Sequence, residues 1–149
     1  MESTGFGFKV LIGFATAIVA LFGLYIGIEI IEKDYEDFDH ISSYQRILDQ
    51  EEDMYFVYWY GPDCLHCKAI KDQVINFARK SDVKVYMIDS SVATGTPNLV
   101  HPTDSTIAMS GTPTLILVKD GKVADMIVGG EDIPSIIKVI EAGEYDLIN

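Results

Sequence analysis

Apolar residues are continuous near the N-terminus of the chain and periodic in the rest of it. Val10–Ile28 is a run of 19 residues without a charged side chain, about the length of a helix that crosses ~30 Å of hydrocarbon. A helix of a soluble core carries one apolar stripe instead of being apolar on every side. We therefore predict a transmembrane anchor over residues 10–31, preceded by a short cytoplasmic tail (1–9) and followed by a charged tether (32–40).

A cleaved signal peptide is the alternative for this segment. Signal peptides have an apolar stretch of about 7–15 residues that ends in a small-residue cleavage site. Here the Ala15-Thr16-Ala17 motif lies inside the run, and the residues after the run are bulky and acidic. These features favour an uncleaved anchor. The short tail and a positive-charge bias of about one favour an N-terminus on the inner side.

Residues 41–149 contain apolar stripes at helical spacing in three places. These helices are expected over residues 41–48, 64–78 and 133–140. The first is supported by the capping-box spacing of Ser42 and Gln45, and the last is expected to stop at Gly143.

Four strands are expected between and after the first two helices: Met54–Tyr60, Val83–Ile88, Leu115–Val118 and Val123–Val128. The first is aromatic and β-branched throughout, which is typical of a strand buried on both faces. The last two flank an Asp120-Gly121 pair that favours a hairpin turn. The polar stretch 90–110 is expected to be a loop with one helical turn at Ile107–Met109. This order predicts an α/β domain with a mixed central sheet flanked by helices.

Composition and charge narrow the function classes. The formal charge of −12 makes nucleic acids and anionic lipid surfaces poor partners. Two cysteines exclude a scaffold held by several disulfides. An aromatic content of 11%, together with both apolar periodicities, excludes a disordered chain.

The motif that carries chemistry is Cys64-Leu65-His66-Cys67, directly after a buried strand. At a helix N-terminus, backbone N–H groups and the helix dipole lower the pKa of the first thiol from about 8.5. Protonated His66 adds to this effect, whereas Asp63 opposes it from solvent. The second cysteine lies one turn later on the apolar face, where it is shielded and suited to resolve a mixed disulfide.

This motif has two alternative interpretations. Half of a zinc site requires further ligands, and neither His40 nor His101, which we expect to be solvated loop residues, has the spacing of a zinc finger. A purely structural disulfide is the second alternative, although such a small ring constrains an unfolded chain very little. No metal ion or organic cofactor is therefore expected.

Together with its surroundings, this motif makes the sequence resemble the thioredoxin superfamily, and within it the membrane-tethered, extracytoplasmic bacterial members. The features that agree in order are the aromatic strand ending in Tyr58-Trp59-Tyr60, Cys64-x-x-Cys67, Gly111-Thr112-Pro113-Thr114, and the hairpin ending in Gly129-Gly130. The resemblance covers roughly residues 41–143 and implies a thioredoxin-like fold. It also implies that Pro113 is a cis-proline facing the cysteines. An X-Pro bond is where a cis peptide is least costly, and an ordinary trans-proline at a strand entry is the alternative.

The resemblance implies a single-pass protein of the cell membrane whose extracytoplasmic domain exchanges disulfides with exported proteins and with a membrane redox partner. Cys64 is then the nucleophile, Cys67 the resolving thiol and His66 the tuner of the thiolate, and Thr112 and Pro113 form the edge that docks substrate. The alternatives are a thiol reductant, for example in cytochrome c maturation, and an accessory or chaperone-like protein of a secretion system.

The sequence departs from thioredoxin in two respects. Tyr58 and Val85 occupy the positions of a buried acid and a nearby lysine that assist the resolving cysteine in thioredoxin. Efficient thioredoxin-like reduction is therefore not expected. The stretch from Asp89 to Pro113 is longer than in thioredoxin; a substrate groove and a tolerated surface insertion are both consistent with it.

Overall fold

The structure is a computed structural model that describes residues 34–145. The predicted tail and anchor lie outside this range, so their structure remains a prediction. Within the described range, no helix is long and apolar enough to cross a membrane.

The centre of the domain is a four-stranded sheet in the order β2-β1-β3-β4. The strands are β1 (Met54–Tyr60), β2 (Lys84–Asp89), β3 (Thr114–Lys119) and β4 (Lys122–Val128). β1 pairs in parallel with β2 and antiparallel with β3, and β4 is antiparallel to β3. The predicted mixed sheet is therefore confirmed.

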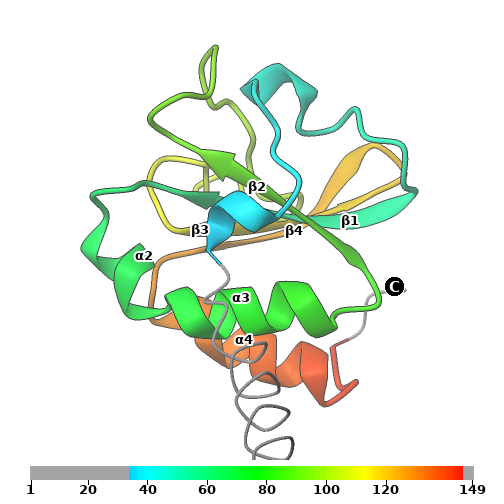
Figure 1. Cartoon of the computed structure of the whole chain (residues 1–149). Coiled ribbons are helices and arrows are strands. Elements are labelled where there is room, and N and C mark those ends of the chain that lie inside the picture. The colour runs from blue at the N-terminus through cyan, green and yellow to red at the C-terminus, as the bar shows by residue number, and fades with distance from the viewer. Residues whose placement is uncertain (1–33, 146–149) are drawn as a thin grey trace, which may run out of the picture. The chain divides into compact units, whose positions relative to one another are not determined.

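Helices cover one face of this sheet (Figure 1). They are α2 (Leu65–Ala69), α3 (Lys71–Lys80) and α4 (Asp132–Glu141). The predicted second helix is present but divided, because Ile70 leaves helical geometry with φ −106° and ψ 6°. The hairpin turn is as predicted: Asp120 and Gly121 have φ values of 50° and 68°, the left-handed geometry of a tight two-residue turn.

Successive residues of β1 point to opposite faces of the sheet. Phe56, Tyr58 and Tyr60 belong to the core under the helices. Tyr55, Val57 and Trp59 belong to a second core, which is covered by loops. Burial on both faces explains why this strand shows no polar alternation.

The predicted first helix is wrong: this region forms only the 3-10 turn η2 (Tyr44–Arg46). Instead of forming a helix, the backbone here is hydrogen-bonded to β2 and to the loop that follows it. The Ile41 N–H donates to the Met87 carbonyl, and the Tyr44 N–H donates to the Thr94 carbonyl. The expected capping box is also not formed, since Ser43 is the N-terminal cap residue and no side chain caps the turn.

The helical turn expected at Ile107–Met109 is also wrong. The Met109 N–H donates to the Leu99 carbonyl at 2.9 Å, and the His101 N–H donates to the Ile107 carbonyl at 2.8 Å. These two hydrogen bonds join separate parts of the loop, and Val100 and Ala108 between them form an antiparallel bridge. The backbone groups that a helical turn needs are therefore engaged elsewhere.

The folded domain begins before residue 41. A short 3-10 helix, η1 (Tyr35–Asp37), buries Tyr35 under α2 and α3, and His40 forms a parallel bridge with Met87 of β2. The described part of the predicted tether, residues 34–40, is thus a packed segment.

Candidate active site

The two cysteines lie where β1 passes into α2. The Cys64 N–H donates to the Gly61 carbonyl, closing a tight turn after the strand. Cys64 is the N-cap of α2, and it is disulfide-bonded to Cys67, with the two Cα atoms 5.2 Å apart. The Cys67 N–H donates to the Cys64 sulfur at 3.1 Å. One of the free N–H groups of the first helical turn is thus directed at this sulfur.

The two sulfur-bearing residues differ in accessibility. Cys67 is 1% exposed and belongs to the core under the helices, whereas Cys64 is half-buried. Of the two sulfur atoms, that of Cys64 is therefore the one that solvent and other molecules can approach. A backbone N–H on the accessible sulfur stabilises negative charge there once the disulfide is opened.

The peptide bond between Thr112 and Pro113 is cis, as expected, and Thr112 lies next to the disulfide. The Thr112 carbonyl oxygen is 3.4 Å from the Cys64 sulfur. The entry to β3 is fixed by Thr114, which is fully buried and donates its hydroxyl hydrogen to the Gly111 carbonyl at 2.7 Å. The backbone carbonyl of Thr112 therefore borders the Cys64 sulfur.

His66 is exposed on the surface of α2. Its Cβ lies close to the backbone between β4 and α4: a Cβ added at Gly130 would be only 2.9 Å from it. Gly130 therefore allows the close approach of this turn to the active-site helix. The imidazole lies on the side of Gly130, since its Nδ1 is 3.5 Å from the same added Cβ, and it is exposed to solvent.

A group of tyrosines lies beneath Cys67. The Tyr35 hydroxyl donates to the Cys67 carbonyl at 3.1 Å and lies 3.5 Å from the Tyr58 hydroxyl. The Tyr35 and Tyr60 rings are 4.4 Å apart between centroids. Burial raises the pKa of Tyr35 to about 12 and raises the pKa values of Tyr58 and Tyr60 as well. These hydroxyls are therefore neutral at physiological pH.

Sequence reasoning missed this contact. Tyr35 stands in a run of charged residues that resembles a solvated linker. The available signal was a single aromatic residue beside Asp34, which caps η1 with its carboxylate. Tyr58, noted from the sequence as a departure from thioredoxin, is fully buried, and its neutral hydroxyl stands where thioredoxin has an acid.

The two other histidines, expected to be solvated loop residues, are both hydrogen-bonded. The His40 Nδ1 is 2.9 Å from the Phe38 carbonyl, so it is the donor, and Nε2 then accepts from the Tyr60 hydroxyl at 3.2 Å. The His101 Nε2 lies 2.8 Å from the Asp125 carboxylate. Within residues 34–145, no group of three or more His, Cys, Asp or Glu side chains is placed to hold a metal ion.

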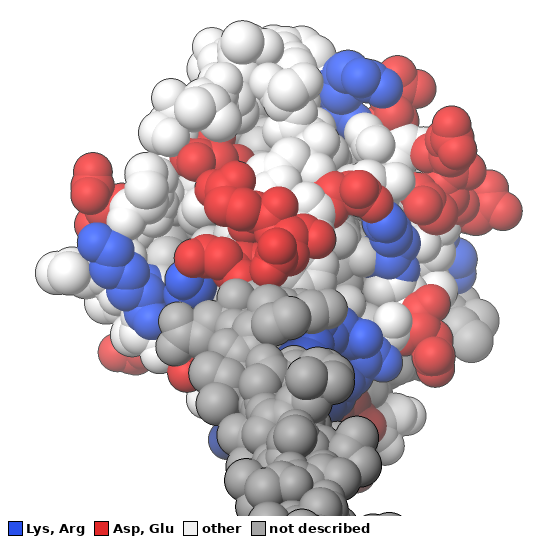
Figure 2. Space-filling view, viewed as in Figure 1, with Lys and Arg blue, Asp and Glu red and all other residues white. Residues whose placement is uncertain are grey.

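The loop that follows β2 carries little charge. Between Ser90 and Val118, the only residue with a charged side chain is Asp104. Figure 2 shows this as uncharged surface over the loop that follows β2, whereas acidic side chains gather over η1. The exposed side chains of this loop are therefore mostly uncharged.

Solved structures of similar fold come from distant organisms. Mitochondrial thioredoxin 3 of Saccharomyces cerevisiae is 21% identical with a TM-score of 0.55, covering 77% of this chain and 100% of its own. A variant thioredoxin of Halobacterium salinarum is 22% identical with a TM-score of 0.53, covering 74% of this chain and 93% of its own. Thioredoxin f2 of Chlamydomonas reinhardtii is 15% identical with a TM-score of 0.51, covering 73% and 99%.

These structures share the fold with this chain, and at such identities they show no more than that. No curated protein matches the chain. The thioredoxin family model, however, matches residues 38–142, which include the sheet, the helices and the disulfide. On that match, this chain belongs to the thioredoxin family.

Proposed function

We propose that this protein is a thiol–disulfide oxidoreductase that acts on exported proteins through Cys64 and Cys67. The observation that carries the proposal is the asymmetry of the disulfide. A half-buried cysteine at a helix N-terminus accepts a backbone N–H on its sulfur, and its partner is buried. This arrangement suits attack at one sulfur and resolution by the other.

In the oxidising direction, a substrate thiolate attacks the Cys64 sulfur. The bond between the cysteines breaks, and Cys67 leaves as a thiolate that takes up a proton. A second substrate thiolate then attacks the substrate sulfur of the mixed disulfide and releases Cys64 as a thiolate. The substrate thiolates lose two electrons, which the protein gains. Cys67 takes up one of the two protons that the substrate thiols released, and the other stays in solvent because Cys64 is left as a thiolate. Reduction of a substrate disulfide is the reverse sequence, and neither direction needs a metal or an organic cofactor.

Three further residues complete the proposed site. The Thr112 backbone, beside the Cys64 sulfur, and Pro113 dock an extended substrate segment. In such docking, main-chain hydrogen bonds give affinity independent of substrate sequence. His66, exposed on the same helix, stabilises the Cys64 thiolate when its imidazole is protonated.

The proposal includes attachment to the cell membrane through residues 10–31, with the N-terminus inside and the domain outside. It is supported by the uncharged run Val10–Ile28, since a spanning helix needs about 20 apolar residues. A membrane redox partner then sets the net direction of electron flow. An electron-delivering partner would make the protein a reductant, and a quinone-linked oxidase would make it a source of disulfides.

Catalysis is tested with the full chain and its Cys64→Ser and Cys67→Ser variants. We expect the wild-type protein to exchange disulfides with a dithiol peptide and glutathione. Cys64→Ser should lose this activity, and Cys67→Ser should accumulate mixed disulfides on Cys64, because nothing resolves them. Equal activity of Cys64→Ser and the wild type would refute the assignment.

The attachment is tested separately in intact cells. We expect the chain to stay in the membrane fraction after carbonate extraction, and the domain to be digested by protease added outside protoplasts. A mature chain that starts near residues 18–30 would contradict the anchor. A domain protected from the protease would contradict the proposed side of the membrane.

A further inference from the structure

The segment before β1 places one tyrosine directly under the active-site helix. Tyr35 is 6% exposed, and its hydroxyl donates to the carbonyl of Cys67 at 3.1 Å. Two contacts therefore fix the backbone of Cys67: its carbonyl oxygen accepts from Tyr35, and its N–H donates to the Cys64 sulfur at 3.1 Å. The residue that donates to the reactive sulfur is thus tied to η1.

A second hydroxyl supports the direction of this hydrogen bond. Tyr58, fully buried on β1, has its hydroxyl oxygen 3.5 Å from that of Tyr35. A hydroxyl has one hydrogen to donate and can accept as well. When Tyr35 donates to the Cys67 carbonyl, Tyr58 can donate to Tyr35. Burial raises the pKa of Tyr35 to about 12, so it remains a donor over the whole range in which thiols titrate.

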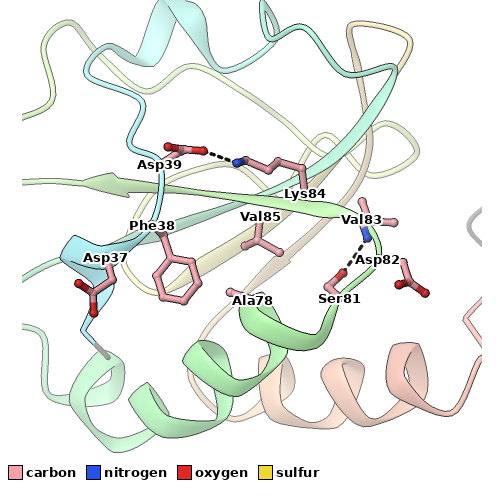
Figure 3. A pocket seen from close by; sticks show the side chains of 9 residues that line it. All are labelled: Asp37, Phe38, Asp39, Ala78, Ser81, Asp82, Val83, Lys84 and Val85. Atoms are coloured by element: carbon pink, nitrogen blue, oxygen red, sulfur yellow. Dashed lines mark hydrogen bonds and ion pairs between the residues drawn. The ribbon is translucent and has the colours of Figure 1, made fainter. Parts of the chain in front are cut away.

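The segment that carries Tyr35 is held at both of its ends. Asp34 forms an ion pair of 2.6 Å with Lys71 at the start of α3, and the Lys71 ammonium lies 5.7 Å from the centre of the Tyr35 ring. At the other end, Asp39 pairs with Lys84 of β2, and the Phe38 side chain lies near Val85 (Figure 3). The position of Tyr35 is therefore defined by contacts with α3 and β2.

We propose that Tyr35 is a positioning residue for the disulfide: by fixing the Cys67 backbone it keeps the Cys67 N–H on the Cys64 sulfur, and so sets the redox potential of the pair. The family match begins at residue 38, so this contact comes from a part of the chain outside the matched region. The inference rests on the proposed redox function of the two cysteines.

The proposal predicts in which direction the redox potential changes when the Tyr35 hydroxyl is lost. Once the disulfide is reduced, the Cys64 thiolate depends on the donors directed at it. Without the Tyr35 hydroxyl, the Cys67 backbone is held at one point fewer, and its N–H is less well aligned with the sulfur. The reduced form is then less stable, so the disulfide becomes harder to reduce.

The test compares Tyr35→Phe with Tyr60→Phe in the full chain. Tyr60 belongs to the same group of tyrosines, but its hydroxyl donates to His40 and not to Cys67. We expect Tyr35→Phe to lower the equilibrium constant for reduction by glutathione about three- to tenfold, the range for one hydrogen bond. A tenfold change corresponds to about 30 mV. Tyr60→Phe should change it less than twofold, by the same reasoning.

The two variants also separate positioning from simple stability. If Tyr35→Phe and Tyr60→Phe lower the unfolding midpoint alike and neither moves the potential, Tyr35 is a packing residue and the inference is wrong. Faster hydrogen exchange at the Cys67 amide in Tyr35→Phe alone supports it. Tyr58→Phe provides a second test: we expect it to change the equilibrium constant for reduction in the same direction as Tyr35→Phe, but by less. The potential is measured without a protein substrate, so the outcome stands even if exchange with exported proteins is not found.

Discussion

The two faces of the sheet are equally well buried but differ in what covers them and in what they carry. α3 and α4 cover one face, and its core includes Cys67 and the tyrosines beneath it. The other face is covered by η2 and by the loop between β2 and β3, which adds Leu99, Ile107 and Met109. The disulfide chemistry is thus associated with the face that regular helices hold in place.

The polar groups of the two faces differ as well. On the helix-covered face, the hydroxyls of Tyr35, Tyr58 and Tyr60 all have partners. On the loop-covered face, the buried Trp59 Nε1 is without a hydrogen-bond partner among the described residues. A buried donor without a partner costs free energy. Among the described residues, the buried side-chain polar groups of the helix-covered face are therefore more fully hydrogen-bonded than those of the loop-covered face.

The largest test of this contrast uses two neighbouring residues of β3. Leu115 and Ile116 are both fully buried, and they point to the helix-covered and the loop-covered core, respectively. Replacing either with alanine should lower the free energy of unfolding by about 2–5 kcal/mol. We expect the larger loss for Leu115→Ala, because packed helices close a cavity less readily than loops do. Denaturant titration measures both, and a reversed order would show that the loop-covered face is the more rigid.

A smaller effect is expected where the loop is attached to the sheet. Asp125 of β4 contacts His101 of the loop at 2.8 Å and accepts a hydrogen bond from the Tyr145 hydroxyl. Asp125→Ala removes the partner of the His101 Nε2 and of the Tyr145 hydroxyl and should cost about 1–3 kcal/mol. Hydrogen exchange should become faster at the amides of His101 and Met109, and not in β1. Asp125→Asn keeps one acceptor oxygen, so it should give an intermediate result; equal effects of the two variants would argue against the contact.

The smallest effect concerns the attachment of η1 to the helix-covered face. The hydrogen bond from Lys71 holds the pKa of Asp34 below its usual value. This stabilisation is present above the carboxyl's ordinary pKa and is lost as the pH falls through the lowered value. Because the pair is largely exposed, Asp34→Asn should cost less than about 1 kcal/mol at neutral pH. The difference in stability from the wild type should disappear as the pH falls below the lowered pKa of Asp34. A constant difference across pH would contradict the ion-pair explanation.

The sequence predicted the helix-covered face well because that face depends on periodic patterns. The continuous aromatic and β-branched run made β1 recognisable as a strand buried on both faces, and Gly121 after Asp120 marked the hairpin. The pair Cys64 and Cys67 identified the reactive site, because their spacing and position at a helix start have a direct chemical meaning. The break at Ile70 left no signal, since its side chain continues the apolar stripe of the helix.

The loop-covered face was predicted poorly for a physical reason. The apolar residues of 41–48 have helical spacing, but their backbone is engaged by Met87 and Thr94, which lie far away in the sequence. The pairing of Leu99 with Met109 is likewise set by tertiary contacts and not by local propensity. The same holds for Tyr35, whose role depends on a carbonyl of Cys67 more than thirty residues away.

The bridge between His40 and β2 has a consequence for self-association. An exposed edge strand offers unpaired N–H and C=O groups to strands of other molecules. Here the Met87 N–H donates to the Asp39 carbonyl, and the Met87 carbonyl accepts from the Ile41 N–H. The middle of this sheet edge is thus capped by the protein's own chain, which removes a template for edge-to-edge aggregation.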